Sequence, residues 1–591
     1  MRILSLIALI LLLTACGNQP IRPDKQQYPG LLQAQNWYQQ SQYSNAALAY
    51  EQLYQNYRRP EFALLAADSW LQEKNYDNAK QQLSLIQSSS QPLFHLLHTQ
   101  LSLLEADYSL ALWHIKQVPN TITGRYRPRY LSLQADLDFY QQDYLHAALL
   151  LIELSQLKPH IDYSNQIINN LLLTTEQQLN KALFQLDVTE LQQGWLEAAY
   201  LANTQDNTAI RQWRQRWPNH PAQAFFLQNN YYQNIAVLLP LSGKYKNISK
   251  SIQHGMMAAL YKNGASQQQL TFFDTGAQGQ NFSYAWYGAI ESGADFIVGP
   301  LLKSSIKQLQ LINSSTVPVM LLNTIEDVEG ENNSDYFQFA LSPEDEVRNV
   351  AERLIAENKK RIMLLGPESE SGRKLARKFE NDLLSRGGQV VSYEFYPASA
   401  NDYSLEIKKA LGINESVIRA RRLQSILSHK LKTAAQIRPD IDAIFILAKP
   451  KQARLIKPQL KFYQAEDVPV YSTSQILSPI TDAALNKDLN GIKFCQSAFV
   501  IDPSSMQELL NFNTDTIKDN TKYFAFGYDA IAINSRLEWM QKVLKQKVQG
   551  LSGLLSVDAQ GKLHRDLAWA QFNKGTPTLL PSLSSNPGQE Q

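Results

Sequence analysis

The stretch IAVLLPLSGKY, residues 235 to 245, decides the fold of the carboxyl-terminal half of the chain. Its first seven residues form a continuous apolar run, which is typical of a strand buried on both faces of a parallel sheet. The turn residues that follow lead into a helical stretch from 247 to 260. This strand–turn–helix order predicts the first unit of an α/β domain.

The same alternation of short apolar runs and helical stretches continues along the chain. Six more runs are predicted strands: 270–274, 295–300, 317–323, 361–366, 390–396 and 442–448. Continuous apolar strands, each followed by a helix, indicate parallel pairing. Because so many elements exceed one hydrophobic core, we expect two lobes.

This region resembles the type I periplasmic binding proteins, in which two α/β lobes joined by three crossings close around a ligand. The segments that carry the resemblance are the opening run with its helix, VGPLLKSS (298–305), VPVMLLN (317–323) and FAFGYDAIAI (524–533). The resemblance implies a first crossing near 339–346 and a closing hairpin within 550–575. It also implies approximate lobe boundaries: 235–341 and 473–550 for lobe 1, and 342–472 and 551–575 for lobe 2.

The amino-terminal half contains a recurring Y-x-x-A phrase just before apolar helical stretches. Its four copies begin at Tyr43, Tyr76, Tyr108 and Tyr144, which are 33, 32 and 36 residues apart. This spacing brackets the 34-residue tetratricopeptide period, in which helix pairs stack into a solenoid. Each tyrosine is expected to start the second helix of a pair, where the alanine three positions later allows close packing. The segment WLEA, 195–198, resembles a fifth, displaced copy.

We therefore predict an all-α, tetratricopeptide-like solenoid over residues 31–216, with a concave surface that binds protein. A polar tract with two prolines, 217–234, interrupts the helix periodicity and is the predicted linker to the α/β domain, 235–575. The last residues, 576–591, are rich in proline and serine and are predicted to be disordered.

The amino terminus reads as a bacterial export signal. The apolar run from Ile3 to Leu13 follows Arg2 and is too short to span a bilayer as a helix. Residues LTAC, 13–16, resemble the lipobox of bacterial lipoproteins, which implies that residues 1–15 are removed and that Cys16 is lipidated. Three acyl chains give a stable anchor. The alternative is a cleaved signal in which this cysteine is incidental.

The residue after the cysteine bears on location. Gly17 stands where inner-membrane lipoproteins commonly have Asp, so the resemblance implies the outer membrane, with 16–30 as a lipidated linker. The only other cysteine is Cys495, so a lipidated Cys16 excludes an intramolecular disulfide. We expect Cys495 to be a small buried residue.

The charge balance excludes one class of partner and leaves one local patch. A net charge of +2 gives no broad basic surface for nucleic acid. One segment, 449–461, is locally basic, with five cations and no acidic residue: Lys449, Lys451, Arg454, Lys457 and Lys461. It is either the solvated face of a helix or a docking patch for an acidic partner.

Several small polar residues follow the predicted strands of lobe 1. They are Ser242, Gly243, Ser304, Ser305 and Thr324. In binding proteins of this fold, hydroxyls and main-chain N–H groups at such positions hold a small polar ligand at helix amino termini. Alternatively, these residues cap helices and satisfy backbone donors. Asp529, in the late helix, is expected to be structural.

The sequence contains no catalytic constellation that we can recognise, so we predict no enzyme activity and no cofactor. The S-x-x-K spacing of penicillin-binding proteins occurs three times, at Ser155, Ser304 and Ser371, but the accompanying K-T-G never occurs. No metalloprotease, nucleotide or dinucleotide motif is present. His95 and His98 lie three residues apart, but no cysteine or acidic ligand accompanies them, so we expect core or groove histidines rather than a metal site.

Taken together, the lipobox, the helical repeats and the two-lobed region resemble the LpoA family, outer-membrane lipoproteins that activate class A penicillin-binding proteins. The resemblance covers nearly the whole chain. It implies a regulator that reaches through the peptidoglycan and stimulates the transpeptidase of penicillin-binding protein 1A. By residue it carries over only Cys16. The competing hypotheses are a lipid-anchored receptor for a small polar solute and a peptidoglycan-processing enzyme.

Overall fold

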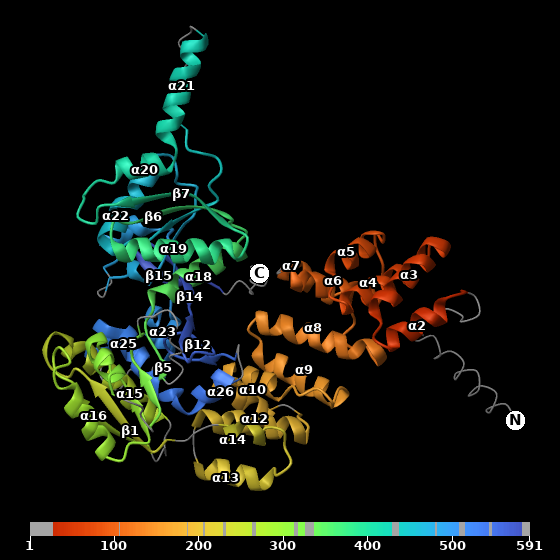
Figure 1. Ribbon diagram of the computed structural model, residues 1–591, viewed down its shortest axis with the longest axis horizontal. Coiled ribbons are helices and arrows are strands. Elements are labelled where there is room, and N and C mark those ends of the chain that lie inside the picture. The colour runs from red at the N-terminus through yellow and green to blue at the C-terminus, as the bar shows by residue number, and fades with distance from the viewer. Residues whose placement is uncertain are drawn as a thin grey trace. The chain divides into compact units, whose positions relative to one another are not determined.

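The computed structural model describes residues 28–581, except for 106, 186, 205–206, 229–231, 263–267, 313–316, 326–335, 428–435, 479–481, 507–513 and 543–545 (Figure 1). The predicted signal peptide, Cys16 and the tail from 582 onward therefore lie outside the described residues. Within the described ranges, no helix is long and apolar enough to cross a bilayer. The chain divides into two compact units, the first ending at Asp138 and including Gln156–Lys158, the second comprising Phe139–Ser155 and Pro159–Gln591.

The first unit is built from pairs of contacting helices, and the second helix of each pair begins at a repeat tyrosine. Its α-helices are α2 (Leu31–Gln39), α3 (Tyr43–Tyr57), α4 (Pro60–Gln72), α5 (Tyr76–Ser84), α6 (Pro92–Leu104), α7 (Tyr108–Ile115) and α8 (Arg127–Tyr140). The fourth repeat tyrosine begins α9 (Tyr144–Leu157). The alanine three positions after each of the four tyrosines is buried. The predicted repeat is confirmed.

The turn before each repeat tyrosine explains why the helix starts there. Asn75 and Asp107 accept a hydrogen bond from a backbone N–H in the first turn of α5 and α7, at 3.2 and 3.0 Å. One residue earlier, Ser41, Lys74 and Gln142 adopt positive φ angles of 59°, 63° and 63°. A left-handed residue reverses the chain, and the capping side chain satisfies a free donor of the next helix.

The second unit begins with five more helices after α9. They are α10 (Ser164–Leu173), α11 (Glu176–Gln185), α12 (Glu190–Thr204), α13 (Asn207–Arg216) and α14 (Gln223–Gln228). Trp195 lies inside α12 rather than at its start, so the fifth repeat copy was wrong. The predicted linker was also wrong, because residues 217–234 contain α14 and the first residue of the next strand.

Contacts between distant segments explain why these helices belong to the second unit. Trp539 is buried in α26 (Leu537–Lys542), and its indole N–H donates to Asn165 Oδ1 at 3.1 Å. The Trp539 ring also meets Phe225 of α14 edge-on, with 5.3 Å between centroids. The Lys547 N–H donates to Asn169 Oδ1 at 2.8 Å. The boundary between the units therefore falls inside the predicted solenoid and not at its end.

The first lobe contains a five-stranded, all-parallel sheet in the order β2-β1-β3-β4-β5. Its strands are β1 (Asn234–Leu239), β2 (Gln269–Asp274), β3 (Phe296–Val298), β4 (Val319–Leu321) and β5 (Tyr336–Gln338). Its helices are α15 (Lys246–Lys262), α16 (Phe282–Glu291), α17 (Lys303–Gln310) and α25 (Thr514–Ala532). Four of these strands were predicted from their apolar runs, whereas the three-residue β5 was not.

Two glycines allow α15 and α25 to pack with their backbones in contact. A Cβ atom on Gly255 would lie 2.0 Å from the carbonyl oxygen of Phe524, and one on Gly527 would lie 2.0 Å from that of Ile252. Only glycine permits so close an approach of two helices. The late helix therefore joins the first lobe, as the resemblance implied.

The second lobe contains a seven-stranded sheet in the order β15-β14-β10-β9-β8-β6-β7. Its strands are β6 (Arg361–Pro367), β7 (Gln389–Tyr396), β8 (Ala443–Ile446), β9 (Val470–Ser472), β10 (Lys493–Gln496), β14 (Ala568–Asn573) and β15 (Thr576–Leu579). Its longer helices are α18 (Pro343–Ala356), α19 (Glu370–Leu384), α20 (Ser404–Ala410), α21 (Ile413–Leu427) and α22 (Pro450–Phe462). Strands β14 and β15 are antiparallel and the rest pair in parallel.

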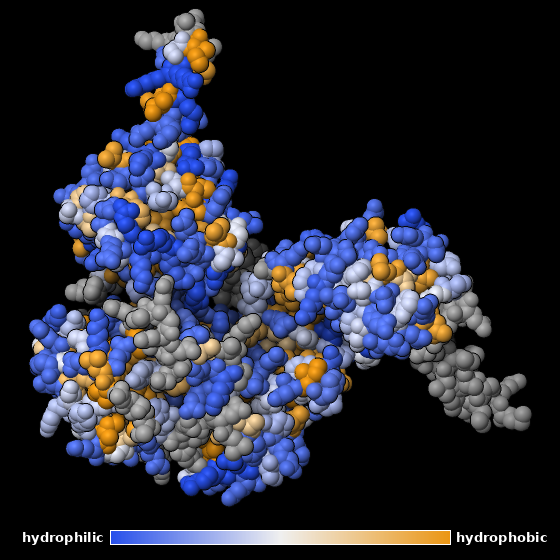
Figure 2. All heavy atoms as spheres, in the orientation of Figure 1, coloured by the Kyte–Doolittle hydropathy of each residue, from blue (hydrophilic) through white to orange (hydrophobic). Residues whose placement is uncertain are grey.

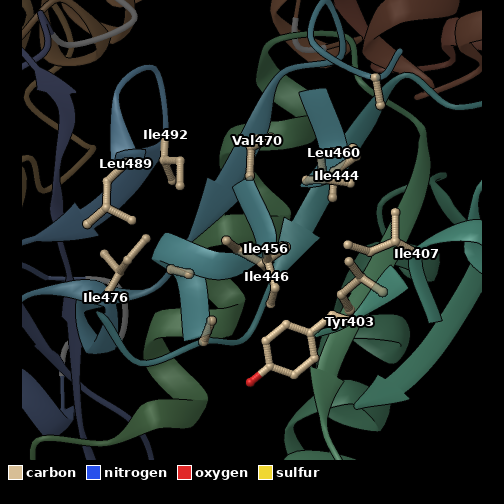
Figure 3. Close-up of a cluster of buried hydrophobic side chains, with 14 of the residues drawn as sticks. Tyr403, Ile407, Ile444, Ile446, Ile456, Leu460, Val470, Ile476, Leu489 and Ile492 are labelled. Carbon is tan, nitrogen blue, oxygen red and sulfur yellow. The ribbon is translucent and has the colours of Figure 1, made fainter. Parts of the chain in front are cut away.

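Apolar side chains fill the space between this sheet and its helices. On one face, Ile456 and Leu460 of α22 and Ile407 of α20 pack with Ile444 and Ile446 of β8 (Figure 3). On the other face, residues of α18 and α19 pack against the same strands. The two-lobed α/β architecture is confirmed.

Two predicted boundaries in this region were wrong. The chain was expected to return to lobe 1 at residue 473, but β10 pairs in parallel with β9 and antiparallel to β14. The tail was expected to begin at 576, but residues 576–579 form β15 beside β14. Both strands are four residues long. The partners of β10 are distant in sequence, whereas β15 pairs with the adjacent β14.

Candidate functional site at the joint between the lobes

The two lobes meet at a small sheet of three antiparallel strands, β11 (Val548–Gln549), β12 (Leu554–Val557) and β13 (Leu563–Asp566). The first turn of α18 packs against β13. The chain enters α18 directly after β5 of lobe 1, near the crossing predicted at 339–346. These elements therefore connect lobe 1, the hairpin and lobe 2, and we call them the joint.

A histidine held between two carboxylates lies at the centre of the joint. His564 Nδ1 lies 2.9 Å from Asp345 Oδ1, and His564 Nε2 lies 3.0 Å from Asp558 Oδ2. Hydrogen bonds to Asp345 and Asp558 raise the pKa of His564 to about 9, against the opposing effect of burial. The imidazole is therefore charged at neutral pH and donates from both nitrogens.

A second cluster ties α18 to the strand that carries His564. Arg348 Nη1 lies 2.9 Å from Asp566 Oδ1, and Lys547 pairs with the other oxygen of that carboxylate. Burial opposes ionisation of Asp566, but the two cations lower its pKa. The Asn349 side chain donates to the Arg565 carbonyl at 2.9 Å and accepts from the Leu567 N–H at 2.8 Å. A side-chain amide thus bridges α18 and the chain that enters β14.

Buried carboxylates fix the joint to both lobes. Asp529 of α25 accepts hydrogen bonds from the Leu551 and Ser552 N–H groups, both at 2.7 Å. Burial raises the pKa of Asp529 to about 6. Glu346 of α18 accepts from the Ser474 N–H at 3.1 Å and from its hydroxyl at 2.7 Å, at the end of β9. Both carboxylates accept hydrogen bonds from protein donors. They therefore stabilise the joint and are not free to bind a ligand.

The sequence profile of the LppC lipoproteins matches residues 33–575. This chain belongs to the LppC lipoprotein family. A relative named penicillin-binding protein activator LpoA, from Vibrio cholerae, is 25% identical over 605 aligned positions that cover 96% of this chain and 97% of the relative. The protein of the same name from Photobacterium profundum is 26% identical over 67% of each chain.

A solved structure of full-length LpoA from Haemophilus influenzae covers 90% of this chain and 98% of its own, at 19% identity and a TM-score of 0.46. The resemblance to the LpoA family that the sequence indicated is confirmed by the family profile and the curated relatives. Family members with this name are activators, which agrees with the prediction of a regulatory protein.

In this LppC member, a loop contacts three of the five residues predicted to line a ligand cleft. The Ser304 hydroxyl donates to the Gln278 carbonyl at 2.8 Å. A Cβ atom on Gly279 would lie 2.4 Å from Ser305 Oγ, and one on Gly243 would lie 2.4 Å from Ala277 Cβ. The loop of residues 275–281, after β2, therefore packs on these positions.

The loop contacts described above do not involve the two remaining predicted cleft residues, Ser242 and Thr324. Ser242 precedes the short 3-10 turn Gly243–Tyr245, and its side chain makes no capping bond there. The Thr324 N–H donates to Asn323 Oδ1 at 2.9 Å. A ligand at these five positions stays a prediction.

The predicted basic patch lies on and just before α22, and its five cations have different surroundings. Arg454 donates to Asn486 Oδ1 at 2.7 Å, and Lys461 lies 3.5 Å from Glu466. Burial lowers the pKa of Lys457. Lys449 and Lys451 are exposed. The patch is not one uniformly solvated face, and its role in docking stays a prediction.

The hydroxyls of the serines with S-x-x-K spacing lie within hydrogen-bond distance of groups other than the lysine. The Ser155 hydroxyl donates to the Ile152 carbonyl at 2.7 Å, and Ser371 Oγ lies 3.3 Å from Ser369 Oγ. Lys374, the lysine of the third pair, lies 2.9 Å from Glu344 Oε1.

Cys495 is buried, and its thiol donates to the Glu346 carbonyl at 3.7 Å. Burial raises the pKa of that thiol well above its usual value.

The helical unit holds a histidine cluster of a different kind. His95 and His98 of α6 contact His114 of α7, with 3.1 Å between the Nδ1 atoms of His95 and His114. The rings of His98 and His114 stack at 4.6 Å between centroids. Burial, followed by the neighbouring histidines, lowers the pKa of His114 to about 4. The sequence indicated the first two histidines but not His114, which lies on the next helix.

Proposed function

We propose that this chain is a non-catalytic activator of penicillin-binding protein 1A that stimulates peptide cross-linking of peptidoglycan. The observation that carries the proposal is the end-to-end similarity to proteins named penicillin-binding protein activator. Both the helical unit and the two-lobed region take part in that similarity, so the activity is assigned to the whole chain.

The joint supports action by protein contact. A solute receptor of this fold needs lobes that close on a ligand and free polar groups between them. Here the acids of the joint are bonded to protein donors, and loop 275–281 contacts Ser304 and Ser305 at a strand end. A protein that activates a synthase through its surface must bind the active state of that synthase more tightly than the inactive state.

Cys16 is the proposed anchor. The lipobox and the membership of a lipoprotein family support cleavage before Cys16 and acylation of its thiol, and Gly17 favours delivery to the outer membrane. Exchange of Cys16 for alanine should release the protein into the periplasm. Recovery of the Cys16→Ala protein in outer-membrane vesicles would contradict this anchor.

Reconstitution tests the proposed activity. Penicillin-binding protein 1A from the same bacterium is incubated with lipid II, and cross-linked muropeptides are measured with and without the purified chain. We expect the rate of cross-linking to rise and to saturate with the concentration of the chain. An unchanged rate, with binding absent in a pull-down, would refute the proposal.

A further inference from the structure

Helix α21 extends away from the sheet of the second lobe with little support (Figure 1). It follows Ala410 and Leu411, which are buried, but none of residues 413–426 is buried. An isolated helix of this length is only marginally stable in water, because most helical stability in proteins comes from packing of one face. Among the described residues, no element therefore buries a face of α21.

Three large aliphatic side chains are exposed on α21. The exposed fractions are 62% for Ile418, 49% for Leu423 and 69% for Ile426. Large apolar side chains exposed on one helix mark a site of interaction. Figure 2 shows hydrophobic and hydrophilic residues side by side on this projecting helix.

Arginines alternate with these aliphatic residues on the same face. Ile418, Arg422 and Ile426 are spaced by four, as are Arg419 and Leu423. Side chains four positions apart are neighbours on a helix surface, so the five residues form two adjacent rows. We call them the α21 face. With Arg421 included, α21 has three arginines and one acidic residue, Glu415.

The mixture of arginine and aliphatic side chains on the α21 face indicates the kind of partner that it can bind. A helix that lies on a bilayer separates its apolar face from its charged face. In the α21 face, guanidinium groups stand between the aliphatic side chains, and arginine with large apolar residues is the composition of protein interfaces. The complementary surface is a protein groove with apolar pockets and acidic groups beside them.

We propose that the α21 face docks into an acidic, apolar groove on the penicillin-binding protein that this chain activates. This inference rests on the proposed function and assigns it a contact surface. The aliphatic side chains fill the groove and the arginines pair with carboxylates at its edge. The excess positive charge of α21 accelerates encounter with an acidic partner at low ionic strength.

The test compares two double variants of the full chain with a matched control. Ile418→Ser with Ile426→Ser removes the apolar anchors, and Arg419→Glu with Arg422→Glu reverses the charge. The control is Arg377→Glu with Leu384→Ser on α19, where Arg377 is exposed and Leu384 is 65% exposed. Binding to penicillin-binding protein 1A is measured by interferometry at two salt concentrations, and circular dichroism verifies that each variant folds.

We expect each α21 variant to raise Kd at least tenfold, whereas the control stays within twofold of the unmodified chain. Cross-linking should need correspondingly more of the α21 variants for half-maximal stimulation. The charge-reversed variant should also lose the salt dependence of binding. Equal Kd values for both α21 variants and the unmodified chain would overturn the inference and leave the proposed function intact.

Two other results would overturn it in different ways. If the unmodified chain fails to bind or stimulate the synthase, the proposed function fails as well. If α21 is needed instead for sedimentation with phosphatidylglycerol vesicles while synthase binding is unaffected, the partner of α21 is a lipid surface.

Discussion

Histidines in two regions of the molecule differ in charge at neutral pH, one being cationic and the other neutral. In the joint, His564 lies between Asp345 and Asp558, which raise its pKa to about 9. In the helical unit, burial next to other histidines lowers the pKa of His114 to about 4. Ion pairs between His564 and two carboxylates therefore stabilise the joint, whereas neutral, stacked imidazole rings lie between α6 and α7.

The difference has opposite consequences for pH stability. His564 has a folded-state pKa above the unfolded value of about 6.5, so its contribution is complete below pH 6.5 and is lost as pH rises through 9. His114 has a folded-state pKa below the unfolded value, so the folded form is favoured above pH 6.5 and loses stability as pH falls toward 4.

The largest expected effect comes from removing a carboxylate of the joint. Asp345→Ala removes one of the two carboxylates that hold His564, together with the acceptor of the Arg565 N–H, in a buried site. Breaking a buried ion pair from one side costs about 3–5 kcal/mol of unfolding free energy. Urea denaturation monitored by tryptophan fluorescence measures this loss. Asp558→Ala, at the more exposed end of the imidazole, should cost less, and the reverse order would contradict the account.

A smaller effect is expected from overpacking a repeat of the helical unit. Ala79→Leu places a large side chain where the buried alanine lets α5 approach its neighbours. Overpacking of this kind costs about 1–3 kcal/mol. The loss should be equal in low and high salt, because no charge is involved, and thermal melts at two salt concentrations test this. Ala49→Leu, on the less buried side of α3, is the control.

Hydrogen exchange at several pH values sharpens the comparison between the two histidine sites. Amides of α6 and α7 should lose protection as pH falls from 7 to 5. Amides of the β12–β13 hairpin should instead lose protection above pH 9, after correction for the intrinsic rate. Loss of protection in the same pH direction at both sites would show that their charge states do not differ.

The smallest effect is expected at His98. Its Nε2 atom is buried without a hydrogen-bond partner in the described part of the chain, and burial lowers its pKa. His98→Leu therefore breaks no hydrogen bond at this atom and should change Tm little at pH 7.5. At pH 5 the variant should have a higher Tm than the unmodified chain. Protonation of His98 favours the unfolded state at this pH, and the variant lacks that imidazole. The exposed His160→Leu is the matched control, and an equal shift there would contradict the role of burial.

The sequence predicted those elements whose signals are local. Tyr43, Tyr76, Tyr108 and Tyr144 each begin a helix. The signals are local, such as the left-handed Ser41, Lys74 and Gln142 and the capping side chains of Asn75 and Asp107. Continuous apolar runs likewise identified four of the five strands of the first sheet, and β6, β7 and β8 of the seven-stranded second sheet. Strand β10 escaped prediction because its partners, β9 and β14, are set by long-range pairing.

The joint could not be predicted for the same reason. His564 and Asp345 are 219 residues apart, and nothing around either residue indicates the other. The predicted cleft residues follow strands, as expected, but loop 275–281 approaches Ser305 and Gly243 through tertiary packing. A site made by distant segments becomes visible only when those segments are folded together.

The central claim is that this chain activates a class A synthase through protein contact and needs no small ligand. The most direct test is the rate of peptide cross-linking by penicillin-binding protein 1A, titrated with full chain that has been unfolded, dialysed and refolded to remove bound solutes. The account predicts saturable stimulation by the refolded chain alone. Stimulation that returns only after a low-molecular-weight periplasmic fraction is added would contradict it.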